Sequence, residues 1–218
     1  MFEIPLFPLN TVLFPGTPIQ LHIFEERYKQ MINLCLQEKR PFGVVLIRNG
    51  MEAFGPLAEP FRIGCTADIA QIQRLEDERM NLVAVGQDRI RILSLDHQTQ
   101  PYLVGKAHAY PLANPDPAGI AIQAVQLRRQ LVQLVELLSR AGGSQLDLSQ
   151  LPQDGVSLAF LAAAVLQISP LQKQELLSIE RADKLLDRLQ LLYRRELTLM
   201  QTVMADVNSL QAGGFSRN

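Results

Sequence analysis

The sequence has no tryptophan, only two cysteines and three histidines, which limits the chemistry it can support. Cys35 and Cys65 lie far apart and form no C-x-x-C pair, so a four-cysteine zinc site and a thioredoxin-type motif are excluded. We expect both to be reduced, buried side chains of a cytoplasmic protein. The histidines, His22, His97 and His108, have no acidic or cysteine ligand at metal-binding spacing. The sequence therefore predicts no metal and no cofactor.

An excess of charge of either sign is also missing. The chain has 21 Lys and Arg residues against 22 Asp and Glu residues, and its formal net charge is −1. No global field therefore draws it to nucleic acid or to an anionic membrane. The uncharged stretch 155–172 has an apolar centre at 158–166, well short of the roughly 20 residues that span a bilayer. The N-terminus lacks a basic region and a long apolar segment, so we expect no targeting sequence and no membrane partner.

Nucleotide-binding and catalytic signatures are missing as well. The sequence contains no G-x-x-x-x-G-K-[ST] loop, no G-x-G-x-x-G after a strand, no H-E-x-x-H motif and no G-x-S-x-G elbow. A Ser-His-Asp triad stays open, because its members converge only in space. His22, between Leu21 and Ile23, is better explained as a surface or hydrogen-bonded strand histidine than as a catalytic base. We therefore expect no catalytic residue and no enzymatic activity.

What the sequence does have is a globular composition, with 47% hydrophobic and 20% charged residues over 218 positions. Residues 2–110 carry mainly strand and turn signals. Residues 61–69 alternate with period two and the phase slips before Ile72, which predicts a β-bulge near Ala70. Further strands are predicted at 42–47, 80–85, 89–95 and 102–110, with a hairpin turn at 76–79. Five antiparallel strands with short connections favour a barrel or a strongly curved sheet.

One helix interrupts these strands and several follow them. An apolar stripe at helical spacing predicts a helix that caps an open end of the sheet, formed by Phe24, Tyr28, Met31, Ile32 and Cys35. The proline-rich segment 111–117 has no helix or strand period and marks a boundary. The helices predicted after it span 117–141, 157–167, 170–177 and 180–208. The last of these would be roughly 40 Å long at 1.5 Å per residue.

An ordered set of motifs makes the chain similar to a known family. The motifs are IPLFPL at 4–9, VLFPG at 12–16, LHIFEERY at 21–28, FGVVLI at 42–47, IGCTADI at 63–69, VG at 85–86 with RIRI at 89–92, PY at 101–102, QELL at 174–177 and DRL at 187–189. Together they resemble the Lon protease N-terminal, substrate-binding domain, in its stand-alone bacterial and plastid form that lacks the ATPase and peptidase modules. The resemblance covers residues 2 to about 204. One departure is the 76–79 turn, where relatives often have glycine; Glu78 disfavours positive φ, so we expect a different turn type.

The resemblance implies an α+β fold: an N-terminal PUA-like β pseudo-barrel with one capping helix, then a C-terminal α-helical bundle that ends in a long helix. This agrees with the periodicities. We expect a β-rich domain at 1–112, a helical bundle at 113–210 and a frayed tail at 211–218. The resemblance also implies substrate binding without proteolysis, because the ATPase and peptidase modules of Lon are missing from these residues.

Candidate binding residues are apolar side chains in predicted loops. A loop between strands carries Phe54, Pro56, Leu57, Pro60 and Phe61, and loops have no packing role by default. Phe14 and Pro15 are also candidates, although Pro15-Gly16 fits a type II turn that the phenylalanine would anchor to the core. We expect these residues to bind unfolded or extended apolar segments of other proteins, with strand addition to a sheet edge as one mode.

Three functions stay open at this stage. The first is a non-catalytic adaptor or holdase for protein quality control, with an ATP-dependent protease as a further candidate partner. The second is RNA binding, by analogy with PUA domains, which the balanced charge disfavours. Its candidate basic face on the last helix, Arg181, Lys184, Arg188 and Arg195, is interleaved with acidic residues, and Glu180 is expected to pair with Lys184. The third is a hydrolase with a triad hidden from sequence inspection.

Overall fold

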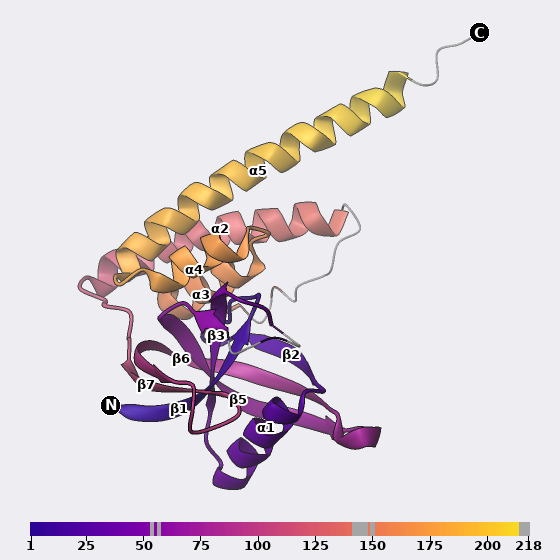
Figure 1. Ribbon diagram of the computed structural model, residues 1–218. Helices are drawn as coiled ribbons and strands as arrows, with labels where there is room; N and C mark the ends of the chain where they lie inside the picture. Colours follow the sequence, from indigo (N-terminus) through magenta and orange to yellow (C-terminus); the bar gives the residue numbers. More distant parts are fainter. Residues whose placement is uncertain (53–54, 56–57, 141–147, 149–150, 214–218) are drawn as a thin grey trace. The chain divides into compact units, whose positions relative to one another are not determined.

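The computed structural model describes residues 1–52, 55, 58–140, 148 and 151–213 (Figure 1). The chain divides into two compact units. Unit 1 comprises Met1–Ala113 and Ala163–Glu180, and unit 2 comprises Asn114–Ala162 and Arg181–Asn218. The first break lies one residue from the division expected from the prolines. Residues 163–180, however, group with the strands and not with the helices on either side of them.

Unit 1 is built on a seven-stranded sheet. Its strands are β1 (Phe2–Leu9), β2 (Pro18–Ile23), β3 (Phe42–Asn49), β4 (Glu59–Pro60), β5 (Ile63–Arg74), β6 (Met80–Asp96) and β7 (Leu103–Ala109). The order is β1-β7-β6-β5-β3-β4, and β1 also pairs with β3, so the strands close on themselves as a barrel. The β1–β3 pair is parallel, whereas the sequence predicted a single antiparallel run. A barrel with helices confirms the α+β class.

Strand β6 is one continuous element of 17 residues, where the sequence predicted two strands at 80–85 and 89–95. Its pairing with β5 shifts register between Cys65 and Ala67, and Thr66 bridges the gap, because its hydroxyl accepts a 3.0 Å hydrogen bond from the Asp88 N–H. A second shift, between Ile69 and Gln71, confirms the predicted bulge near Ala70. These two irregularities let one long strand bend and pair with β5, β7 and β2 in turn.

The β5–β6 turn corrects the expectation for Glu78. Asp77 and Glu78 both adopt left-handed backbone, with φ of 59° and 58°, and the Arg79 N–H donates to the Glu76 carbonyl at 3.4 Å. Two consecutive positive φ values are the mark of the primed hairpin turns, whose twist matches that of the flanking strands. The hairpin therefore has the turn geometry that glycine would favour. The backbone of Glu78 is strained in this turn, although the twist of the turn suits the flanking strands.

We expect Glu78→Gly to raise the free energy of unfolding by about 0.5–1 kcal/mol. A left-handed non-glycine residue costs about 1–2 kcal/mol, and the greater freedom of glycine in the unfolded chain offsets roughly half of that gain. Urea unfolding measures the change. Glu76→Gly is the matched control: Glu76 has no positive φ, so glycine there is expected to destabilise. Equal effects of both substitutions would contradict the turn geometry.

Helix α1 (Glu26–Glu38) packs on the barrel as its stripe predicts. Four of the five stripe residues, Tyr28, Met31, Ile32 and Cys35, are buried and join one core cluster with residues of five strands. The fifth, Phe24, lies before the helix and is 39% exposed, so its place in the stripe was predicted wrongly. Cys35 and Cys65 are both buried free thiols, which confirms that they form no disulfide. Burial raises the pKa of Cys35 to about 11 and that of Cys65 to about 12, so both thiols stay protonated and unreactive at neutral pH.

Two shorter helices lie later in the chain, after α2. They are α3 (Gly155–Val165) and α4 (Pro170–Ser178). Helix α4 begins with a complete capping box. The Ser169 hydroxyl accepts from the Gln172 N–H at 3.3 Å, and the Gln172 side chain accepts from the Ser169 N–H at 3.1 Å. Its Lys173 ammonium donates to the Ala164 carbonyl at 2.8 Å. These contacts fix where α4 starts within unit 1.

Unit 2 contains α2 (Pro117–Arg140) packed on α5 (Ala182–Gly213). Asp116 caps α2, because its carboxylate accepts from the Gly119 N–H at 3.0 Å. The buried Tyr193 of α5 donates to the Ala162 carbonyl at 2.9 Å. Helix α5 runs to Gly213, past the expected end at 208 and into the segment expected to be frayed. Within the described part of the chain, no helix is long and apolar enough to cross a membrane.

Candidate functional site

Phe14 and Pro15 lie in a tight turn that is built into the barrel. The predicted type II turn is confirmed, because the Thr17 N–H donates to the Phe14 carbonyl at 3.2 Å and Gly16 has a φ of +76°. The Phe14 side chain is 0% exposed, and Pro15 is half-buried. Gly86 accommodates this turn, since a Cβ there would lie 2.3 Å from the Phe14 carbonyl oxygen. The Phe14 ring therefore presents no surface to a ligand, in contrast to its candidacy as a binding residue.

The loop candidates fall into two groups. Phe54, Pro56 and Leu57 lie outside the described residues. Pro60 is buried in β4, and Phe61 directly after it is half-buried. Both line a cavity of about 280 Å³, which Arg48, Arg62, Ile63, Gln174 and Ser178 complete. The structure thus brings two of the candidate residues to one site, beside two arginines.

The polar wall of this cavity comes from α4. Gln174 is only 4% exposed, and its amide nitrogen donates to the Ile63 carbonyl at 3.0 Å and to the Ser178 hydroxyl at 3.2 Å. The Ile63 carbonyl is purely an acceptor, so it fixes which way the amide points. No donor within the described residues reaches the Gln174 Oε1. This oxygen is fully buried, so Gln174 closes the inner wall of the cavity without presenting Oε1 to it.

A second hollow lies over residues of β2, β5 and β6. This groove of about 480 Å³ is lined by Gln20, Leu21, His22, Gln71, Ile72, Gln73, Asn81, Leu82 and Val83. Four of these residues carry carboxamide side chains, and none is an acid, a lysine or an arginine. Ile72 is 38% exposed. The groove therefore offers uncharged donors and acceptors beside apolar surface. We call it the amide groove.

Strand β2 forms an open edge beside the amide groove. Among the described residues it pairs only with β6, in an unbroken antiparallel register from Pro18↔Val85 to Ile23↔Met80. The Gly86 N–H donates to the Thr17 carbonyl at 3.0 Å, in the same register. Because hydrogen-bonded pairs alternate along an antiparallel ladder, Gln20 and His22 direct their backbone N–H and carbonyl groups away from β6. These groups are available to another extended chain.

The side chain of His22 is held in place on this edge. A hydrogen bond of 2.7 Å joins its Nδ1 to the Asn81 Oδ1, and its ring stacks on Phe24 at 5.9 Å between centroids. This confirms the hydrogen-bonded strand histidine expected from the sequence. Phe24 is 39% exposed, so the stacked pair adds an aromatic surface next to the open edge.

A third cavity, of about 570 Å³, is lined by residues of β1, β6 and β7, by Leu34 and Arg40, and by the 97–102 segment. Its charged groups already have partners. Lys106 pairs with Glu3 at 3.7 Å, Arg40 pairs with Glu38 at 2.9 Å, and Asp96 accepts from the Gln98 N–H at 2.8 Å. A hydrogen bond from Thr99 lowers the pKa of Asp96. These contacts stabilise a surface turn and offer less to a ligand than the other two hollows.

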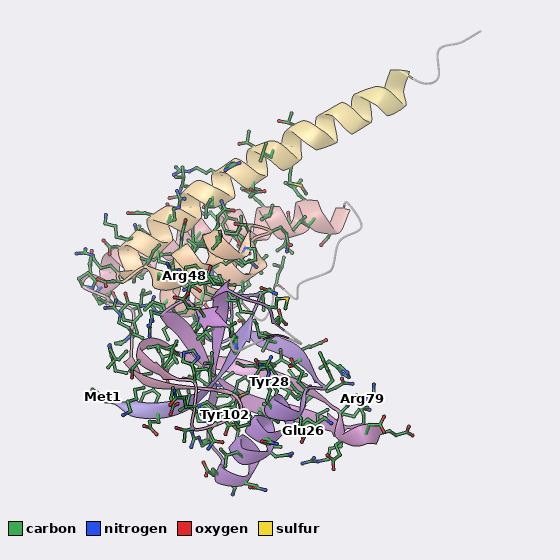
Figure 2. The ribbon with its side chains drawn as sticks, viewed as in Figure 1. Met1, Glu26, Tyr28, Arg48, Arg79 and Tyr102 are labelled. Atoms are coloured by element: carbon green, nitrogen blue, oxygen red, sulfur yellow. The ribbon has the colours of Figure 1, made fainter. Side chains whose placement is uncertain are left out.

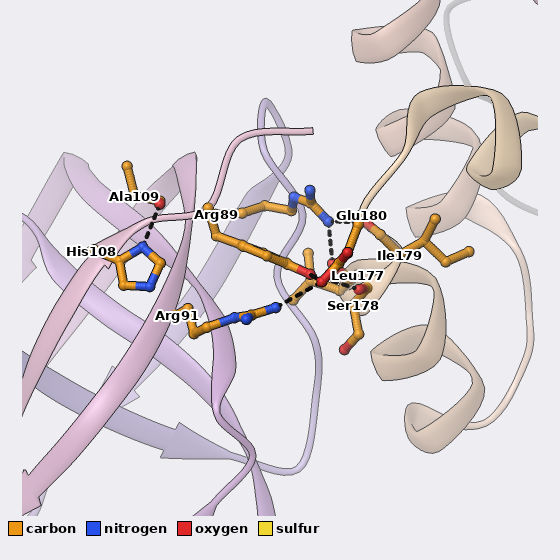
Figure 3. Close-up of polar contacts among 9 residues, drawn as sticks. Arg89, Arg91, His108, Ala109, Leu177, Ser178, Ile179 and Glu180 are labelled. Carbon is orange, nitrogen blue, oxygen red and sulfur yellow. Dashed lines mark hydrogen bonds and ion pairs between the residues drawn. The ribbon is translucent and has the colours of Figure 1, made fainter. Parts of the chain in front are cut away.

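A cationic cluster holds the end of α4 to the barrel (Figure 3). Arg89 is 3% exposed, and its Nη1 donates to the carbonyls of Leu177 at 2.5 Å and Ile179 at 2.6 Å. Burial lowers its pKa. The half-buried Arg91 pairs with Glu180 at 3.0 Å, and the Tyr110 hydroxyl donates to the same carboxylate at 3.0 Å. Hydrogen bonds from Tyr110 and Arg91 lower the pKa of Glu180. The cluster is a structural support for the Gln174 wall.

Glu180 therefore does not pair with Lys184 as the sequence suggested. Lys184 instead pairs with Asp187 at 3.6 Å, and Arg181 pairs with Asp183 at 2.9 Å. The hydrogen bonds from Tyr110 and Arg91 give Glu180 better partners than one exposed lysine. The expected salt pairing of the basic face is thus present at two of its members, with different partners.

Comparison with known proteins identifies the family. The model for the ATP-dependent protease La (LON) substrate-binding domain matches residues 3–195. The chain belongs to this family. The Lon proteases of Paraburkholderia phytofirmans and Anaeromyxobacter dehalogenans are 27% and 25% identical over 82% and 80% of the chain. The matches cover 23% and 21% of those proteins. The chain, as a member of the Lon substrate-binding domain family, therefore spans about a quarter of the length of these curated relatives.

Solved structures of Lon N-terminal domains share this fold. The Lon N-terminal domain protein from Xanthomonas campestris has a TM-score of 0.64 at 24% identity, covering 87% of this chain and 97% of that one. The N-terminal domain of the Mycobacterium avium complex Lon protease has a TM-score of 0.67 at 18% identity, covering 88% and 98%. The resemblance inferred from the motifs is thereby confirmed for family and fold.

Sequence reasoning missed the amide groove and the Gln174 wall. In the sequence nothing distinguishes Gln20, Gln71 and Gln73 from ordinary solvent-facing strand residues. The pairing of β6 with both β2 and β5 brings them to one surface. The bulge slip before Ile72 was the one available signal, because it moves Gln71 and Gln73 to the same face as Asn81. Gln174 lies 111 residues from its partner Ile63, a separation that periodicity cannot bridge.

Proposed function

We propose that this chain is a non-catalytic module that binds unfolded or extended polypeptide segments. The observation that carries the proposal is the open edge of β2 beside the uncharged amide groove. An extended chain added to this edge would exchange backbone hydrogen bonds with Gln20 and His22, whatever its side chains. Carboxamides recognise peptide groups in the same sequence-independent way. Membership in a substrate-binding domain family supports polypeptide as the ligand.

The expected affinity is modest. Each client phenylalanine or leucine buried against Phe24, Ile72 or a loop side chain contributes about 1.5–3 kcal/mol before ordering costs. A few such contacts, together with net gains of about 0.5–1.5 kcal/mol for each hydrogen bond, give a Kd in the micromolar range. Weak, sequence-tolerant binding suits an adaptor or holdase that must release its client.

The loop that contains Phe54, Pro56, Leu57, Pro60 and Phe61 is proposed as a second contact for the same client. Phe61 and Pro60 support this role by lining a cavity. Within the cell we propose a cytoplasmic role in protein quality control, for which the free cysteines and the Lon relatives are the supporting observations. An ATP-dependent protease is the proposed downstream partner. RNA binding has no comparable support, since Arg181 and Lys184 both have carboxylate partners.

Strand addition is tested with two versions of one labelled, extended peptide, the second N-methylated at alternate residues. Fluorescence anisotropy with the wild-type protein is expected to give at least fivefold weaker binding of the N-methylated peptide, because it cannot hydrogen-bond to a strand edge. Gln20→Pro is expected to weaken binding of the unmodified peptide to a similar extent, because proline removes the outward-facing N–H at position 20 of β2. Edge strands tolerate proline, so the fold should be retained.

The matched control is Gln20→Ala, which keeps the backbone N–H and removes only the carboxamide. It should weaken binding less than Gln20→Pro does, with both variants retaining the wild-type melting transition. Equal binding of the two peptides would contradict strand addition at β2. Displacement of the labelled peptide by an unlabelled single-stranded RNA of similar length would instead favour the RNA-binding alternative.

A further inference from the structure

The cavity beside Phe61 has a composition that the amide groove lacks. It combines an apolar wall of Pro60, Phe61 and Ile63 with two guanidinium groups, Arg48 and Arg62. At about 280 Å³ it lies just below the roughly 300–1,000 Å³ of sites that enclose a drug-sized ligand. Its size therefore suits one residue of a polypeptide with its terminal group better than a whole metabolite.

The charge of the cavity is unbalanced toward the positive side. Arg48 pairs with Glu59 at 3.7 Å, and both side chains are more than half exposed. Arg62 is exposed and has no carboxylate partner among the residues that the structure describes. A planar guanidinium is matched to a carboxylate, which it can hold through two parallel hydrogen bonds. The rim thus has one arginine free to take an anion and a second within the same cavity.

The polar inner wall is bonded within the protein. The Gln174 amide nitrogen donates to the Ile63 carbonyl and to the Ser178 hydroxyl, and its Oε1 is fully buried, so this side chain shapes the wall without offering a free group to a ligand. A ligand that fits the cavity must therefore carry an anion next to an apolar group, within the span of one residue.

We propose that this cavity binds the C-terminal residue of an extended polypeptide whose last side chain is apolar. The terminal carboxylate pairs with Arg62 and Arg48, and the side chain lies against Pro60 and Phe61. An aspartate or glutamate side chain supplies the anion without the apolar group. A phosphate supplies the anion but no apolar group. The proposal rests on the proposed function, and it adds a chain end as the feature recognised.

The decisive comparison is between peptides that differ only in their last group. Fluorescence anisotropy is measured with an N-terminally labelled extended peptide that ends in leucine as the free acid, and with the same peptide as its C-terminal amide. The free acid is expected to bind about tenfold more tightly. Arg62→Gln is expected to remove this preference. The variant should bind the free-acid peptide as weakly as the amide, and its binding of the amide should equal that of the wild type.

The matched control is Arg79→Gln, which removes an exposed arginine from the β5–β6 turn of the same unit. Arg48 and Arg79 are well separated in Figure 2, so this variant should keep the tenfold preference. Arg62→Lys keeps the charge without the planar fork and is expected to recover only part of it. Because Arg62 is exposed, the melting temperatures of all three variants should equal that of the wild type.

Several results would overturn the proposal. Equal binding of free acid and amide would leave polypeptide binding intact and remove chain-end recognition. An amidated peptide with aspartate next to its last residue, if it bound as tightly as the free acid, would show a general carboxylate site. Competition by inorganic phosphate at equal strength for both peptides would show a simple anion site. Failure of both peptides to bind would instead contradict the proposed function itself.

Discussion

Replacing Phe14 by alanine is expected to lower the free energy of unfolding by about 3–5 kcal/mol, the range for large-to-small changes at fully buried aromatic positions. The Phe14 side chain is 0% exposed. Its turn is held by Thr17, whose N–H and hydroxyl both donate to the Phe14 carbonyl, at 3.2 and 2.8 Å. Its carbonyl also packs on the Cα of Gly86, where no Cβ has room. The surrounding backbone therefore has little freedom to collapse into the space left by the ring.

Urea unfolding monitored by circular dichroism measures this loss. The matched control is Phe61→Ala, because Phe61 is half-buried and lines a cavity, so its truncation should cost far less stability. Peptide binding is expected to respond in the opposite order: Phe61→Ala weakens it, whereas Phe14→Ala affects it only where the protein unfolds. A Phe14→Ala protein of wild-type stability that no longer binds peptide would assign the ring to the ligand and not to the core.

Replacing Arg89 by methionine is expected to destabilise unit 1 by about 2–4 kcal/mol. Methionine fills a similar volume but cannot donate, so the carbonyls of Leu177 and Ile179 lose the donor that terminates α4. Each buried polar group left unsatisfied costs about 1–3 kcal/mol. The guanidinium also lies 4.7 Å from the centroid of the Tyr110 ring, a cation–π contact that methionine does not replace.

Arg91→Met is the control for this prediction. Arg91 lies two residues along the same strand and contacts Tyr110 and Glu180, but its side chain is 39% exposed against 3% for Arg89, so its loss should change stability much less. Hydrogen exchange would locate the effect of Arg89→Met, with faster exchange expected in α4 than in α1. Equal destabilisation by the two substitutions would show that Arg89 contributes only surface charge.

Much of the fold follows from local periodicity. Four of the five residues of the predicted helical stripe are buried, with Phe24 the exception, and the bulge near Ala70 follows from one slip of strand phase. The parallel β1–β3 pair does not follow, because hydrophobic alternation does not encode which strand a segment pairs with. Pro5 and Pro8 also disguise β1, although both positions have partners in neighbouring strands, Val104 and Val45.

Residues of the candidate site could be predicted only where an apolar side chain occurs in a segment predicted to be a loop. Phe61 and Pro60 stand out as apolar residues of a predicted loop, and they line a cavity. Phe14 stands out for the same reason and yet is core, because turn residues can point inward as well as outward. Arg62, Gln174 and the amide groove carry no such signal, since arginines and carboxamides on strands and helices are usually solvated. Their proximity exists only after the barrel closes.

The central claim is that this chain binds extended polypeptide without catalysing a reaction on it. The most direct measurement is an anisotropy titration of the purified protein into a labelled, permanently unfolded polypeptide, with the same label on a folded protein as reference. The account predicts saturable binding to the unfolded chain at micromolar to tens of micromolar concentration, weak binding to the folded one, and no cleavage of either. Absence of binding to the unfolded chain at tens of micromolar would contradict it.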